Sequence, residues 1–132
     1  MRILLVDDDT GVIQALLPAL KTLAGAEVRA ATSGAKAIEN AAALGGIDLL
    51  ITDVVMPGHM NGKQLADTII IQRPSLKVLF TTGFSDKILS VRDQLDPAVL
   101  LLVKPYRQAE LARMIRMALQ RNYTATPTKS QS

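Results

Sequence analysis

Short apolar segments recur along this chain, and longer segments with helical periodicity separate them. The apolar segments show little alternation with polar residues, which is typical of strands buried on both faces of a sheet. They cover residues 2–6, 27–31, 47–52, 76–81 and 99–103. In the segments between them, apolar residues recur at three- and four-residue spacing, which indicates amphipathic helices. These helices are expected over residues 10–24, 34–44, 63–72, 85–94 and 108–121.

Local signals mark the ends of these elements. Thr10 and Ser33 are suited to cap the first and second helices, with Asp9 as a second candidate for the first, and Gly45-Gly46 ends the second. Pro18 lies inside the first helix and should bend it. The Pro and Gly residues between 56 and 62 indicate a loop.

Alternating strands and helices predict an α/β fold, with a doubly wound parallel five-stranded sheet and helices on both faces. In such sheets, ligands bind beyond the carboxyl ends of the strands. The residues at these ends are therefore the first candidates for a functional site. They are Asp7, Asp8, Asp9, Asp53, Thr81, Thr82, Gly83, Lys104 and Pro105.

Composition narrows the class of protein. A chain of 132 residues, 48% of them hydrophobic, suits one domain with a packed core. The absence of cysteine excludes disulfides and thiolate chemistry, and a single histidine, His59, leaves little room for a histidine metal site. The apolar runs are far shorter than the ~20 residues of a membrane span. Asp7 interrupts the first run too early for a signal peptide, so we expect a cytoplasmic protein with no membrane partner.

The charges are unevenly placed. The net charge is only +3, but residues 104–132 carry six basic residues and one acidic residue. Two Phe, two Tyr and no Trp offer few platforms for stacking bases, so we expect no direct nucleic-acid binding. The basic residues of the last helix are instead expected to form a solvated face that could dock an acidic protein.

The candidate residues suit phosphoryl chemistry. Acids from two strand ends would repel one another unless a divalent cation lay between them. Oxygen ligands without His or Cys favour Mg²⁺, with Mn²⁺ as a substitute. Lys104 adds a fixed positive charge, Thr82 a hydroxyl donor and Gly83 room for close approach. These groups stabilise a phosphoryl group in transfer, and with no Ser or Cys among them an aspartate is the expected nucleophile.

Four separate motifs together resemble the receiver domain of two-component response regulators, of the chemotaxis-regulator type. The motifs are Asp7-Asp8, Asp53 followed by Met56-Pro57, Thr82-Gly83, and Lys104-Pro105. The stretches 52–58 and 80–84 are most similar to receivers of hybrid sensor histidine kinases. The resemblance covers residues 1–121 and implies a flavodoxin-like (βα)5 fold with strand order 2-1-3-4-5. It implies a signalling phosphoacceptor rather than an enzyme, with slow self-dephosphorylation at most.

The resemblance also implies a metal site. Asp8 and Asp53 would bind Mg²⁺ directly, and Asp7 would bind it through water. The backbone carbonyl of Val55 would complete the shell.

The same resemblance assigns the phosphoryl group to Asp53, which would accept it from a histidine kinase or a histidine phosphotransfer protein. Thr82 would hydrogen-bond the phosphoryl group and move inward. Lys104 would pair with a phosphoryl oxygen, and the Lys104-Pro105 bond is expected to be cis.

Two departures from the family pattern affect output and lifetime. The position three before Lys104, often a rotating aromatic residue in this family, is Leu101. The positions two after Asp53 and two after Thr82 are the apolar Val55 and Phe84. Because neither can orient an attacking water, a long-lived phosphorylated state is expected.

The expected organisation is a receiver over residues 1–121 and a polar, disordered tail over 122–132, with no output domain. Signalling would then use the face of the fourth helix, fifth strand and fifth helix, and a downstream protein partner. A homodimer formed on phosphorylation is left open.

Three alternatives to a phosphoaccepting receiver are considered. Asp7 could be the nucleophile of a haloacid-dehalogenase-like phosphatase, although Gly11 and the single acid after Lys104, Glu110, fit that pattern poorly. The other rivals are a receiver-like module that is never phosphorylated and, less favoured still, a direct nucleic-acid binder.

Overall fold

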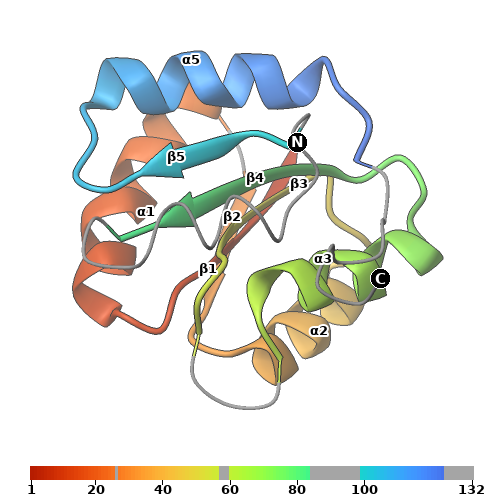
Figure 1. The fold of residues 1–132 in the computed structure, drawn as a ribbon. Helices are drawn as coiled ribbons and strands as arrows, with labels where there is room; N and C mark the ends of the chain where they lie inside the picture. The colour runs from red at the N-terminus through yellow and green to blue at the C-terminus, as the bar shows by residue number, and fades with distance from the viewer. Residues whose placement is uncertain (26, 57–59, 84–98, 124–132) are drawn as a thin grey trace, which may run out of the picture.

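A parallel sheet lies between two layers of helices (Figure 1). The structure, a computed structural model, describes residues 1–25, 27–56, 60–83 and 99–123. Five strands pair in the order β2-β1-β3-β4-β5, and every pair is parallel. Their bounds are Arg2–Val6 for β1, Glu27–Ala31 for β2, Leu49–Asp53 for β3, Lys77–Thr82 for β4 and Leu101–Val103 for β5. The doubly wound fold and the strand order predicted from the sequence are confirmed.

The helices divide between the two faces of this sheet. Figure 1 shows α1 and α5 on one side and α2 and α3 on the other. Their bounds are Thr10–Ala24 for α1, Gly34–Ala43 for α2, Gly62–Gln72 for α3 and Gln108–Leu119 for α5. The helix expected over residues 85–94 lies outside the described residues. Within the described residues, no helix is both long enough and apolar enough to cross a bilayer.

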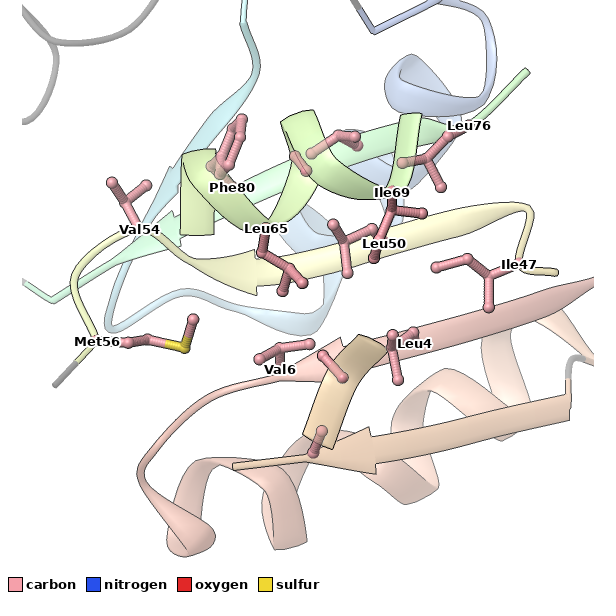
Figure 2. Packing of buried hydrophobic residues seen from close by; sticks show 14 of the residues in the cluster. Leu4, Val6, Ile47, Leu50, Val54, Met56, Leu65, Ile69, Leu76 and Phe80 are labelled. Carbon is pink, nitrogen blue, oxygen red and sulfur yellow. The ribbon is translucent and has the colours of Figure 1, made fainter. Parts of the chain in front are cut away.

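Each strand supplies side chains to both core layers, because successive strand residues point to opposite faces. Leu4, Leu50 and Phe80 pack against Leu65 and Ile69 of α3 (Figure 2). Their neighbours along the strands pack instead in the layer of α1 and α5. Because both faces are covered, packing from each side holds the strands and positions their carboxyl ends.

The residues that cap α1 and α2 can be compared with those predicted from the sequence. Ser33 caps α2 as expected, accepting a hydrogen bond from the Lys36 N–H at 3.2 Å. The prediction that Thr10 caps α1 was wrong. Asp9 is the cap, because its backbone is extended and its carboxylate accepts from the Gly11 N–H at 2.9 Å.

Two strand ends matter for the site. The third and fourth strands were expected to stop at residues 52 and 81, but they continue to Asp53 and Thr82. The parallel pairing causes this, since Asp53 stands opposite Thr81 and Thr82 opposite Val103. Asp53 and Thr82 are therefore held by the sheet itself rather than by a loop.

Candidate functional site

Two buried carboxylates meet at the carboxyl ends of the central strands. Asp7 follows β1 directly, Asp53 ends β3, and these strands are neighbours. The Asp7 N–H donates to the Ala31 carbonyl at 3.1 Å, which ties the residue to β2. Asp7 is only 2% exposed and Asp53 only 5%, whereas Asp8 is exposed to solvent. Burial makes the chemistry of the first two strongly dependent on their neighbours.

Lys104 is the positive partner of both buried acids. Its Nζ lies 2.6 Å from Asp7 Oδ2 and 3.2 Å from Asp53 Oδ2. The Lys104 N–H donates to the Thr82 carbonyl at 2.8 Å, which holds the residue beside the end of β4. The Lys104-Pro105 bond is cis, as expected. Residues far apart in the sequence thus form one charge cluster.

The pKa of Asp53 is raised above its ordinary value. Burial is the largest cause, and the Asp7 charge adds to it, while Lys104 and the Val55 N–H oppose it. The pKa of Lys104 is also raised: burial lowers it, but the hydrogen bond to Asp7 and the charge of Asp53 outweigh that effect. Lys104 therefore stays protonated and is the charge that favours ionised Asp53.

The acids fit a small divalent cation. Carboxylate oxygens of Asp7, Asp8 and Asp53 all lie within 4.8 Å of one another. Hard oxygen donors of this kind suit Mg²⁺, which takes one or two carboxylates and keeps several waters. Lys104 offers only one positive charge to two buried carboxylates, so further positive charge is electrostatically favoured here.

The remaining expected site residues lie at the same edge. Thr82 is fully buried at the end of β4, next to Lys104. The Val55 N–H donates to Asp53 Oδ1 at 3.2 Å, and the Val55 side chain is 45% exposed. The contact of Thr82 with a phosphoryl group and that of the Val55 carbonyl with a metal stay predictions.

Sequence reasoning missed Gly62, the first residue of α3. A Cβ at this position would lie 2.2 Å from the Asp53 carbonyl oxygen and 3.0 Å from Val54 Cα. The Gly62 N–H donates to the Val54 carbonyl at 2.9 Å. Gly62 therefore lets α3 begin directly against the backbone of Asp53. The only signal in the sequence was a glycine that we assigned to a loop.

Known proteins match this chain along most of its length. The family model described as "Response regulator receiver domain" matches residues 3–116. The response regulator receiver protein CpdR of Brucella abortus (strain 2308) is 35% identical over 118 residues, which is 89% of this chain and 96% of CpdR. The sensor kinase CckA of the same strain is 31% identical over 120 residues, 90% of this chain but only 12% of CckA. The regulator NtrC of Azospirillum brasilense is 37% identical over 91% of this chain and 24% of NtrC.

Solved structures agree with these relatives. A response regulator receiver protein from Sinorhizobium medicae WSM419 has a TM-score of 0.77 and 29% identity, covering 91% of this chain and 94% of that one. A CheY-like receiver domain protein from Methanospirillum hungatei JF-1 has a TM-score of 0.73 and 27% identity, covering 90% and 93%. Fold and sequence agree with these proteins, and the chain belongs to the response regulator receiver domain family.

Proposed function

We propose that Asp53 of this receiver is the residue that takes the phosphoryl group, in a Mg²⁺-dependent reaction. Two-component signalling by a phosphoacceptor, rather than catalysis by a conventional enzyme, is the role of its family. One observation carries the assignment to Asp53. Its buried carboxylate ends a strand beside Asp7, Asp8 and the Lys104 ammonium.

The phosphoryl donor would be a phosphohistidine of a histidine kinase or of a histidine phosphotransfer protein. An Asp53 carboxylate oxygen attacks phosphorus, the P–N bond breaks, and the imidazole leaves with the bond's electron pair. Lys104 binds a phosphoryl oxygen, and the Thr82 hydroxyl donates to another.

Asp8, Asp53, Asp7 through water and the Val55 carbonyl would hold Mg²⁺. Mn²⁺ would serve in its place. The bound ion supplies positive charge that offsets the negative phosphoryl oxygens.

Output would be read by a downstream protein in the cytoplasm. Arg113 and Arg116 are exposed along α5, which suits an acidic partner surface there. A dimer formed on phosphorylation would use the same face. The kinase and the downstream protein are to be sought by phosphotransfer and by binding, respectively.

Intact mass after incubation with acetyl phosphate and Mg²⁺ tests the proposal. The wild type should gain one phosphoryl group, and the gain should vanish with EDTA or in Asp53→Asn. Asp48→Asn, which changes an acid at the opposite ends of the strands, is the matched control and should still gain it.

A phosphohistidine protein is the second donor, and no gain from either donor would contradict the proposal. A gain that survives Asp53→Asn and is lost in Asp7→Asn would favour the phosphatase reading.

The phosphorylated state should be long-lived. Val55 stands exposed two residues after Asp53 and cannot orient water, and Phe84 lies outside the described residues. Val55→Asn should shorten the half-life about tenfold, less than the 10²–10⁴ of a fully positioned base. Ile71→Asn, at an apolar residue 79% exposed on α3, should leave it unchanged. Loss of label from purified wild type within seconds would contradict this expectation.

A further inference from the structure

The chain turns back onto the molecule after α5 instead of leaving it. Figure 1 shows it dropping from the end of α5 toward the start of β4. Tyr123 packs on Phe80 of β4, with ring centroids 6.0 Å apart at 64°, an edge-to-face contact. Its hydroxyl donates to Asp67 Oδ1 of α3. Beside it, Lys77 Nζ donates to Asn122 Oδ1 at 2.5 Å. Both residues lie in the segment that we expected to be a disordered tail.

The surface under Tyr123 has the features of a built site. Phe80 is fully buried, and Lys63 is only 6% exposed. The Lys63 Nζ donates to Asp67 Oδ2 at 2.6 Å, which leaves the other oxygen of Asp67 for the tyrosine hydroxyl. An apolar floor and an oriented carboxylate are what a phenol side chain needs when it is half-buried. The phosphoacceptor chemistry uses none of these groups.

Both elements that carry this site reach the phosphoacceptor edge of the sheet, where α3 begins and β4 ends. In α3, Gly62 packs against the Asp53 backbone, and Asp67 lies further along the same helix. In β4, Phe80 and Thr82 are two residues apart, so their side chains share one face of the strand. A shift of either element at the Asp53 site therefore reaches the contacts of Tyr123.

We propose that Tyr123 is a built-in ligand of the site formed by Lys63, Asp67 and Phe80, and that its docking is coupled to occupancy of the Asp53 site. The coupling rests on the proposed function, whereas the docking does not. Phosphorylation would then change how the end of the described chain is held on the α3 side, an output separate from the α5 face.

Fluorine NMR of protein labelled with 3-fluorotyrosine tests the docking. The chain has only two tyrosines, so Tyr106→Phe assigns the two signals. The Tyr123 signal should lie away from that of free fluorotyrosine and move to it in Asp67→Ala. Glu39→Ala, at an exposed acid of α2, is the matched control and should leave it in place. A wild-type signal at the free position, or one that Asp67→Ala does not move, overturns the docking.

Beryllofluoride with Mg²⁺, a stable mimic of an aspartyl phosphate, tests the coupling. The Tyr123 signal should shift when beryllofluoride is added. Because coupling between two sites acts in both directions, Tyr123→Ala should change the beryllofluoride concentration at half-saturation ~5-fold or more. Tyr123 lies beyond α5, so this variant should keep the fold, which circular dichroism checks. An unmoved signal with an unchanged midpoint overturns the coupling. If beryllofluoride does not bind the wild type, the proposed function fails and the coupling with it, while the docking is still decided by Asp67→Ala.

Discussion

Gly62→Ala is expected to lower the free energy of unfolding by about 3 kcal/mol, the upper range for overpacking a filled site. The added Cβ would lie 2.2 Å from the Asp53 carbonyl oxygen and 2.9 Å from its carbonyl carbon. These are backbone atoms of a buried strand, which cannot rotate away as a side chain can. Either α3 moves out or the end of β3 bends. Both outcomes displace Asp53, so phosphorylation should slow along with the loss of stability.

The sign of this effect is informative. Within a helix, alanine is normally more stable than glycine by roughly 1 kcal/mol. A loss at Gly62 therefore measures the clash against the phosphoacceptor strand and not helix propensity.

Gly34 provides the matched control, because it is also buried and also the first residue of its helix. A Cβ there would meet the Met60 side chain, with Sδ at 2.9 Å. A flexible methionine can move aside, so Gly34→Ala should change stability by less than about 1 kcal/mol. Urea unfolding of both variants and of the wild type gives their free energies of unfolding, which are directly comparable when the m-values are equal. Equal stabilities of Gly62→Ala and wild type would contradict the close contact.

The convergence of Asp7, Asp53 and Lys104 could be predicted from the sequence for a general reason. Parallel strands end at one edge, so residues that follow them meet there however far apart they lie in the chain. The residue types then indicated the chemistry. What the pattern could not supply was the geometry, in which Lys104 lies closer to Asp7 than to Asp53.

Features that depend on tertiary contacts could not be predicted from the sequence. The ends of β3 and β4 are fixed by pairing with their neighbours, which hydrophobic patterns of single segments do not show. Gly62 has the same local signal as any loop glycine until Asp53 is placed against it. Tyr123 stands in a polar stretch, and its contacts with Phe80 and Asp67 give it a place in the fold. The domain boundary expected at residue 121 stays a prediction.

Lys104→Met is expected to destabilise the metal-free protein by about 2 kcal/mol. Asp7 and Asp53 would then be two buried carboxylates without a cation, and breaking a buried pair on one side commonly costs 3–5 kcal/mol. The lower figure allows for the Lys104 side chain being 19% exposed, so that water can replace part of its charge. Lys36→Met, at an exposed residue of α2, is the matched control and should change little.

Mg²⁺ should restore much of the lost stability. A ligand that binds the folded state alone stabilises it by RT ln(1 + [L]/Kd), so the melting temperature of Lys104→Met should rise with Mg²⁺ and fall again with EDTA. The gain should exceed that of the wild type, in which Lys104 already neutralises part of the acidic cluster. Equal Mg²⁺ gains in both proteins would contradict an ion seated among these acids.

The pH dependence of the same variant in EDTA has a definite sign. The raised pKa of Asp53 means that, between its unfolded and folded pKa values, the folded state binds more protons and stability falls as pH rises. Lys104 opposes that shift in the wild type, so its removal raises the pKa of Asp53 further and widens the window. The contribution of Lys104, whose pKa is itself raised, is fully present throughout this acidic range. The stability deficit of Lys104→Met should therefore shrink as the pH is lowered through this window, because protonating Asp53 removes one of the two unpaired buried charges. A deficit that grows on acidification would mean that the carboxylates do not depend on Lys104.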